Sequence, residues 1–203
     1  MKLEIKLLCT DFHGTLHTDL FRPPVPARLQ HQVARLQHCG AKWILTSGQD
    51  AQALQAELEQ GDLGIWPDFI VTREREIHER VGDSYVPLKS WNKRSGEAHE
   101  AWSTRVAKVL GKLDERLETE FQVRAQSDDS SLFQLMVPEG RRADLIAELI
   151  RTHCAAISGG AIVRSRGHFR LLNARLNNGT ALAAIAHQLR LGPGQVMAAG
   201  GII

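Results

Sequence analysis

The sequence predicts an α/β protein whose three-layer core, built on a parallel sheet, is interrupted by an inserted α+β domain. Short apolar segments alternate with helical patterns over the first third of the chain, as in parallel sheets with right-handed crossovers. The middle changes to helices followed by strands, and the end returns to the first pattern. We therefore expect residues 1–79 and 169–203 to form the core, and residues 80–168 to form the insert.

The first part of the core is predicted from three apolar segments and two helical patterns. Apolar residues recur every three or four positions between Pro26 and Gly40 and again between Ala51 and Gly61, and both segments end in a glycine, which commonly terminates helices. The three apolar segments are continuous, as in strands covered on both faces. They are IKLLCTDF (5–12), AKWILTSG (41–48) and PDFIVT (67–72).

The insert is predicted as a helix, strand, strand pattern that occurs twice. The charged segment REREIHER (73–80) leads into it and reads as a solvated hairpin or hinge. Amphipathic helices are expected from about residue 97 and over 141–154. The expected strands are EFQVRA (120–125), SLFQLMVP (131–138), AIVRS (161–165) and HFRLLNA (168–174).

The end of the chain is predicted to complete the core. Residues 177–189 form a helical pattern, and residues 192–203 read as a turn followed by a fourth buried strand. We expect the strand ending at Asp11 to lie between the strand ending at Ser47 and the strand at 196–200.

Composition restricts the classes of partner. The formal net charge of +2 gives no indication of binding to nucleic acid or to an anionic membrane. The N-terminal segment is interrupted by Glu4 and Lys6, unlike a signal peptide, and no apolar run approaches transmembrane length. The three cysteines are far apart and form no metal-binding spacing, so we interpret them as reduced, buried thiols of a cytoplasmic protein.

Asp11 and Ser47 are the residues whose position indicates chemistry. Both follow apolar strands, and the carboxyl ends of parallel strands are where ligands bind. A carboxylate there can attack a phosphoryl group and form an acyl-phosphate, while the Ser47 hydroxyl and loop amides such as that of Gly48 can bind phosphoryl oxygens. An aspartate at a strand end is also commonly a cap or turn residue, so the spacing alone leaves both interpretations open.

Four segments carry a family resemblance. DFHGTLHT resembles the DxDGT(L/V) signature of haloacid dehalogenase (HAD) superfamily phosphatases, and ILTSGQ resembles their second motif. LNNGTALAAIA is similar to the third motif, and VMAAGG to the strand that leads to the fourth. Their order resembles the branch with a large cap between the second and third motifs, the Cof-type and sugar-phosphate phosphatases. The resemblance implies a Rossmann-like core, a cap domain, and Mg²⁺-dependent hydrolysis of a small phosphate monoester, such as a sugar phosphate.

The resemblance also implies a role for each matching position. Asp11 matches the nucleophile and Ser47 the phosphate-binding hydroxyl. His13 stands where the family has its acid/base aspartate, Asn178 where it has a lysine, and Gly201 where it has an acidic metal ligand. Mg²⁺ would be left with Asp11 and the backbone carbonyl of His13, a weak site.

These departures lead to an expectation of weak or absent activity. The alternative is a pseudophosphatase that binds a phosphorylated metabolite or a protein partner. Members of the family continue beyond the fourth strand, so we expect part of the core to be missing after Ile203, or to be covered by a partner or a second copy. His13 and His17 have a spacing that suits a metal ion on a helix, but this segment is predicted to be a loop and we expect no metal there.

Overall fold

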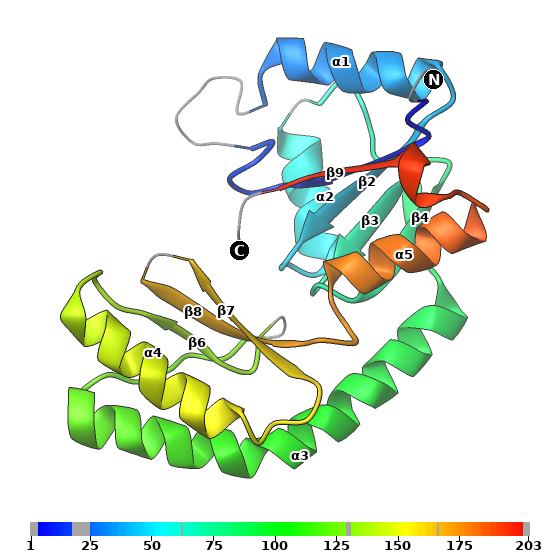
Figure 1. Cartoon of the computed structure of the whole chain (residues 1–203). Helices are drawn as coiled ribbons and strands as arrows, with labels where there is room; N and C mark the ends of the chain where they lie inside the picture. Colours follow the sequence, from blue (N-terminus) through cyan, green and yellow to red (C-terminus); the bar gives the residue numbers. More distant parts are fainter. Residues whose placement is uncertain (1–3, 18–24, 62, 129–130, 166, 201–203) are drawn as a thin grey trace. The chain divides into compact units, whose positions relative to one another are not determined.

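The structure is a computed structural model that describes residues 4–17, 25–61, 63–128, 131–165 and 167–200 (Figure 1). The chain divides into two compact units. The core unit comprises the described residues of Met1–Lys93 and Asn178–Gly201, and the cap unit those of Arg94–Asn177. No described helix combines the length and apolar character needed to cross a bilayer.

The core unit is built on a six-stranded sheet in the order β5-β4-β3-β2-β1-β9. Its strands are β1 (Leu7–Asp11), β2 (Lys42–Ser47), β3 (Phe69–Thr72), β4 (Glu76–Val81), β5 (Ser84–Pro87) and β9 (Val196–Ala199). β9, β1, β2 and β3 are parallel, whereas β4 and β5 are antiparallel additions. The predicted placement of β1 between β2 and β9 is therefore confirmed, and the carboxyl ends of these strands share one edge of the sheet.

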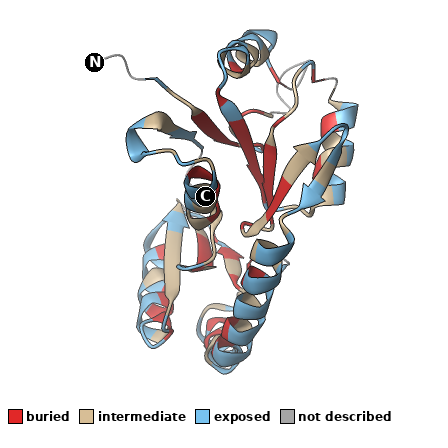
Figure 2. Cartoon of the chain, turned by 90° about the vertical axis from the view of Figure 1, so that its right-hand side faces the viewer, coloured by how far each residue is buried: buried red, intermediate tan, exposed pale blue. Residues whose placement is uncertain are grey.

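Helices cover both faces of this sheet. Helices α1 (Ala27–His38) and α2 (Ala51–Gln60) pack on one face with the cluster that includes Leu8, Trp43 and Leu45. Helix α5 (Asn178–Gln188) packs on the other face with Leu7, Cys9 and Ile44. Alternate residues of β1 and β2 thus face opposite layers, which explains why both strands are continuously apolar in sequence. Figure 2 shows that burial is concentrated in the central strands.

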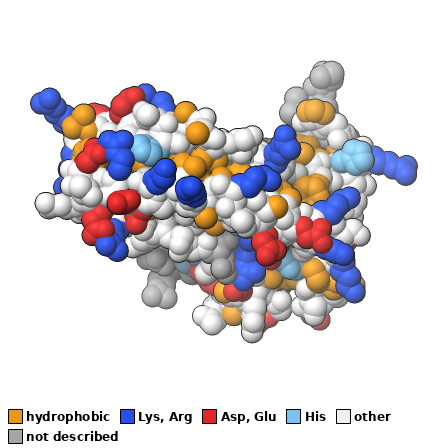
Figure 3. Space-filling model, turned by 90° about the horizontal axis from the view of Figure 1, so that it is seen from below, with side chains coloured by type: hydrophobic (Ala, Val, Ile, Leu, Met, Phe, Trp, Pro, Cys, Tyr) orange, Lys and Arg blue, Asp and Glu red, His pale blue; other side chains and the backbone are white. Residues whose placement is uncertain are grey.

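The cap unit packs two helices on one face of a three-stranded antiparallel sheet. The sheet has the order β6-β8-β7, formed by β6 (Gln134–Met136), β7 (Gly160–Ser165) and β8 (His168–Asn173). Helix α3 (Lys89–Phe121) begins in the core unit and continues through the cap, where it packs with α4 (Arg141–Cys154) over the sheet. Acidic and basic side chains are interspersed over the face shown in Figure 3, which is consistent with the low net charge.

Several elements differ from the sequence expectations. The charged segment 73–80 belongs to a hairpin, one of its two expected forms, but it is not solvated: β4 pairs antiparallel with β3, and Ile77 is fully buried. Because the β4–β5 hairpin belongs to the core sheet, the cap unit begins at Arg94 rather than at 80, and because β8 pairs only within the cap sheet, it extends to Asn177.

Two expected strands also differ. EFQVRA is not a strand, since α3 continues to Phe121, and the cap therefore has one helix, strand, strand unit rather than two. β9 is at the edge of the described sheet and is mostly exposed, not buried. Cys9 and Cys154 are buried free thiols, as expected, but Cys39 is exposed.

Candidate active site

Asp11 stands at the carboxyl edge of the core sheet, as the last residue of β1, which lies between β2 and β9. Thr46 is opposite Asp11 in the register of β1 and β2, and its hydroxyl donates a hydrogen bond to Oδ1 of Asp11. Thr46 is buried, so water cannot readily replace this donor. The sequence analysis missed Thr46, although aligning the polar ends of CTD and LTS would have placed it beside the carboxylate.

Gly200 forms the opposite wall of the Asp11 carboxylate. It follows β9, which pairs with β1 so that Ala199 lies beside Thr10. A Cβ atom on Gly200 would be 3.0 Å from Cγ of Asp11 and closer still to Oδ2. The position therefore accepts only glycine unless the carboxylate moves.

Ser47 and Gly48 begin the loop between β2 and α2. Ser47 is buried, and its Oγ accepts the N–H of Gln49 at 3.2 Å and lies 3.4 Å from Gln49 Oε1. Asp50 then caps α2 by accepting the N–H of Ala53 at 2.8 Å. The loop places the N-terminus of α2 at the same edge as Asp11, where backbone N–H groups suit an anionic ligand.

His13 points toward α2. Its Nε2 lies 3.1 Å from Oε1 of Glu57, and about half of its side-chain surface is exposed. The loop after β1 turns at Gly14, which has a φ of 73°, and the N–H of Gly14 bonds to the carbonyl of His17. His13 and His17 thereby form an isolated β-bridge, and Nε2 of His17 lies 3.7 Å from the same Glu57 oxygen.

Asn178 is the first residue of α5. Because α5 precedes β9 and β9 runs parallel to β1, the helix begins at the carboxyl edge of the sheet. Within the described part of the chain, the Asn178 Oδ1 atom is buried without a hydrogen-bond partner. The sequence position assigned to the family's acidic metal ligand, Gly201, lies outside the described residues.

Lys42 does not replace the missing lysine. It starts β2, at the opposite edge of the sheet from Ser47, and its Nζ bonds to Oδ1 of Asp68 at 2.7 Å. Cys9 is not an alternative nucleophile either. Burial, with a smaller contribution from the negative charge of Asp11, raises the pKa of its thiol to about 12, so the thiolate does not form near neutral pH.

The donors around Asp11 fit Mg²⁺ poorly. Asp11 supplies one carboxylate, one of whose oxygens already accepts from Thr46, and positions 196–203 contain no acidic residue. Among the described residues, the only group of three or more histidine, cysteine or acidic side chains with converging ligand atoms is formed by His13, His17 and Glu57. Mg²⁺ prefers hard oxygen ligands, so neither set makes a Mg²⁺ site by itself.

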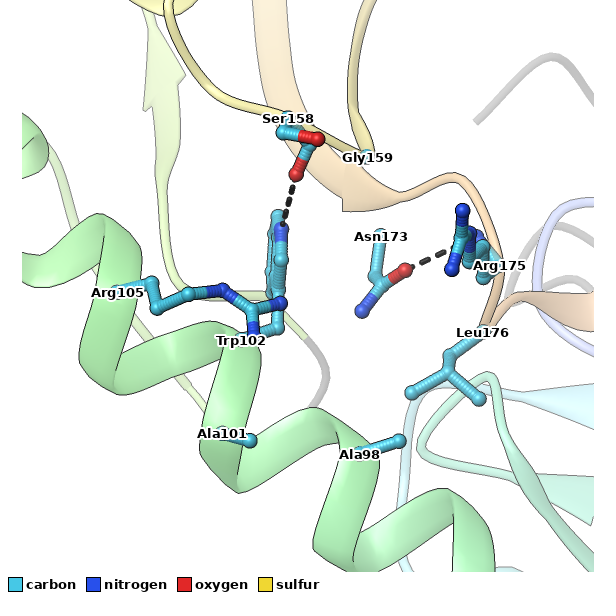
Figure 4. Close-up of a pocket in the computed structure, with 9 residues that line it drawn as sticks. All are labelled: Ala98, Ala101, Trp102, Arg105, Ser158, Gly159, Asn173, Arg175 and Leu176. Carbon is cyan, nitrogen blue, oxygen red and sulfur yellow. Dashed lines mark hydrogen bonds between the residues drawn. The ribbon is translucent and has the colours of Figure 1, made fainter.

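The cap unit has a pocket of its own with a volume of about 240 Å³ (Figure 4). Arg105 of α3 and Arg175, which follows β8, stand on its walls, and no acidic side chain lines it. Trp102 also lines the pocket and donates from Nε1 to the carbonyl of Ser158 at 3.2 Å. The two guanidinium groups make this pocket suitable for an anionic group.

The fold is also found in solved structures of phosphatases. Sucrose-phosphatase from Synechocystis, solved with sucrose and phosphate, has a TM-score of 0.69 at 18% identity and covers 97% of this chain and 75% of its own. IMP-nucleotidase from Plasmodium falciparum has a TM-score of 0.69 at 13% identity, covering 96% of this chain and 58% of its own. A HAD-superfamily phosphatase from Bacteroides thetaiotaomicron has a TM-score of 0.58 at 15% identity, and the match covers 97% of this chain and 77% of that phosphatase.

These similarities confirm the predicted fold. The chain has the α/β fold of HAD-superfamily phosphatases, and the likeness extends over nearly its whole length, cap included. No protein-family model matches the sequence, and no curated protein sequence matches it significantly. The activity must therefore be argued from this chain's own residues.

Proposed function

We propose that the site at Asp11 binds small phosphate monoesters and transfers their phosphoryl group to Asp11, with slow turnover. The observation that carries this proposal is the placement of the Asp11 carboxylate between the Thr46 hydroxyl and the Gly200 backbone, beside the loop that begins at Ser47. A carboxylate held at the carboxyl edge of a parallel sheet, next to a helix N-terminus, combines a nucleophile with an anion-binding position.

The proposed reaction proceeds in two steps. An oxygen of Asp11 attacks phosphorus, the bond from phosphorus to the alcohol oxygen breaks, and the alcohol leaves after taking a proton. Water then attacks the aspartyl-phosphate, which releases inorganic phosphate and restores the carboxylate. Amides of the loop that begins at Ser47 and Gly48 bind the phosphoryl oxygens, and His13 is the proton donor and acceptor nearest in sequence.

Slow turnover follows from the charges that this site lacks. Asn178 can donate hydrogen bonds to a phosphoryl oxygen if its amide is rotated, but it carries no positive charge to offset Asp11 and the phosphoryl group. Binding of Mg²⁺ requires the oxygens of the phosphate ligand in addition to Asp11. His13 points toward Glu57, so it must rotate before it can protonate a leaving group.

Hydrolysis of p-nitrophenyl phosphate with Mg²⁺ tests this proposal. We expect a slow rate that is lost in Asp11→Asn and retained in Asp83→Asn, a matched change at the fully exposed turn between β4 and β5. Phosphoryl transfer should also leave a trapped aspartyl-phosphate that mass spectrometry detects on the peptide containing Asp11. Equal rates in the wild type and in Asp11→Asn would contradict the proposal.

A non-catalytic binding protein is the second candidate. It is favoured by the neutral Asn178, whose buried Oδ1 has no hydrogen-bond partner among the described residues. Such a protein would bind phosphate or a phosphorylated metabolite at this site without turnover. Isothermal titration with inorganic phosphate distinguishes the two: binding that Asp11→Asn leaves intact, together with no hydrolysis, supports the binding protein.

A further inference from the structure

The loop that follows the nucleophile has a second feature, in which three metal-ligand side chains converge. His13 and His17 come from the loop after β1, and Glu57 comes from α2. The ligand atoms of the three side chains all lie within 4.8 Å of one another, and both imidazoles approach the same carboxylate oxygen, at 3.1 and 3.7 Å. These spacings are within small side-chain rotations of the separation between two ligands on one metal ion.

The fold fixes the positions of the two histidines. The N–H of His17 bonds to the carbonyl of Phe12 at 2.8 Å, and the N–H of Gly14 bonds to the carbonyl of His17 at 3.1 Å. Phe12 is buried beneath the loop, and its ring centroid lies 4.9 Å from that of His13 and 5.0 Å from that of His17. The turn therefore brings the side chains of His13 and His17 together, as a helix would do for two residues four positions apart.

Glu57 is also held in place. Leu54 and Leu58 of the same helix are fully buried, so α2 is anchored on the sheet beside this position. Gln49 donates from Nε2 to the second carboxylate oxygen of Glu57 at 3.0 Å, which leaves the first oxygen toward the histidines. A hydrogen bond from a neighbouring side chain to a ligating carboxylate is a common support of metal sites.

We propose that His13, His17 and Glu57 form a binding site for a zinc-class transition-metal ion. Two imidazoles and one carboxylate are the protein donors of open, four-coordinate zinc sites, and imidazole selects such metals over Mg²⁺. Glu57 and His17 are largely buried, whereas the side chain of His13 is 50% exposed, so a fourth position on the ion remains open to water or an external oxygen ligand. This site is separate from the Asp11 carboxylate and does not depend on phosphatase activity.

The metal site has a consequence for the loop. Coordination through His13 Nε2 removes that nitrogen as a proton donor, so a loaded site and acid catalysis by this nitrogen exclude each other. Coordination also requires deprotonated ligands, so metal binding releases protons and the affinity must fall as the pH is lowered.

The test is a titration of the full chain, free of any affinity tag, with Zn²⁺ in competition with a chromophoric chelator. Cys39→Ser serves as the common background, because that thiol is exposed. We expect one Zn²⁺ per chain. Loss of an outer group that only supports a ligand commonly weakens metal binding by about 10- to 100-fold. We expect a larger loss of Zn²⁺ affinity from each change to a ligand itself: His13→Ala, His17→Ala and Glu57→Gln. Gln49→Ala should weaken it by about that smaller amount.

Matched controls separate this site from general histidine affinity. The first control is His31→Ala, because His31 is exposed on α1. The second is Glu59→Gln, because Glu59 follows Glu57 by two residues on α2 but accepts a hydrogen bond from Gln55. Both should bind Zn²⁺ as the background does, and circular dichroism should show all variants folded. Co²⁺ should give the visible absorption of a four-coordinate ion, absent in the His13→Ala, His17→Ala double variant. Equal affinities of the background and that double variant would overturn the proposal.

Discussion

The hydroxyl of Thr46 donates to Oδ1 of Asp11 across the register of β1 and β2, and this bond holds the carboxylate in its place at the sheet edge. The relationship follows from strand pairing: when two parallel strands end together, their last polar side chains become neighbours. Thr46 is almost completely buried, so loss of its hydroxyl leaves an oxygen of Asp11 without a protein donor.

Replacement of Thr46 by valine should therefore destabilise the core. We expect Thr46→Val to lower the free energy of unfolding by about 1–2 kcal/mol, since a hydrogen bond to a charged group is lost while a methyl group is gained. Thr72→Val is the matched control, because the Thr72 hydroxyl is equally buried but has no partner among the described atoms. That change should be neutral or stabilising. Urea unfolding of both variants measures the difference, and equal losses would contradict our account.

Gly200 should tolerate no side chain while Asp11 keeps its position. In Gly200→Ala the new methyl group overlaps the Asp11 carboxylate, so the carboxylate or the end of β9 must shift. We expect phosphate binding and any hydrolysis of p-nitrophenyl phosphate to fall at least tenfold (about one decade), as misplacement of a reacting group commonly costs this much or more. Gly194→Ala, at an open position before β9, should change neither property. Unchanged activity in Gly200→Ala would show that the site does not use the Asp11 geometry described above.

The sequence predicted the core because its elements are periodic and local. Continuous apolar strands with helices between them require a parallel sheet, and this alone predicts that Asp11 and Ser47 lie at one edge. The burial of β4 was not predicted, although a hairpin was one of the forms expected there, because Ile77 is its only strongly apolar buried residue. Its burial comes from pairing with β3, which no local pattern records.

The contacts of the candidate site were predicted less well, because they depend on long-range geometry. Glu57 is 44 residues from His13, and its place on the polar side of α2 gave no sign that it faces the first loop. His17 was set aside because its spacing suited a helix, whereas the turn at Gly14 brings it beside His13. Thr46 was overlooked because the family motif directs attention to Ser47. The neighbours of each of these residues come from another segment of the chain, so they are recognised only when the positions of both segments are known.

Restoring the family residues should raise hydrolysis. In His13→Asp a carboxylic acid replaces an imidazole that points toward Glu57, and in Asn178→Lys a cation enters at the N-terminus of α5. Each change should increase the rate by about 10²-fold, because a positioned acid/base or charged donor commonly contributes on that order. Steady-state kinetics with p-nitrophenyl phosphate measure the effect. If both changes slow a wild-type enzyme that is already fast, His13 and Asn178 are adaptations rather than losses.

Binding of Mg²⁺ to the free protein should be weak. The Asp11 carboxylate is the one acidic group at this edge in the positions that the family uses, and Mg²⁺ gives up its water reluctantly. Isothermal titration should show no saturation at millimolar Mg²⁺ without phosphate, and measurable binding when phosphate adds its own oxygens. The Glu57→Gln variant should behave like the wild type, since His13, His17 and Glu57 suit softer ions. Tight binding to the free protein that disappears in Asp11→Ala would refute this expectation.

The stability of the core should fall on mild acidification because of His78. This histidine is buried on β4, and its Nδ1 has no hydrogen-bond partner among the described atoms. Burial lowers the pKa of His78, and the positive charge of Arg73 lowers it further, against the opposing effect of Glu76. The unfolded chain, in which histidine titrates near pH 6.5, therefore binds a proton that the folded chain resists. The contribution is fully present above about pH 6.5 and is lost as the pH falls from there through the lower pKa of the folded state.

Replacing His78 by glutamine should remove this dependence. Urea unfolding between about pH 7.5 and 5 should show a slope smaller by up to about 1.4 kcal/mol per pH unit, the limit for one proton, in His78→Gln than in the wild type. His31→Gln, on the exposed surface of α1, is the matched control and should follow the wild-type curve. Parallel curves for wild type and His78→Gln would mean that His78 accepts a proton without opening the β3–β4 pair. If the slope of the wild type grows when the ionic strength is lowered, the effect comes from the charge of Arg73 rather than from burial.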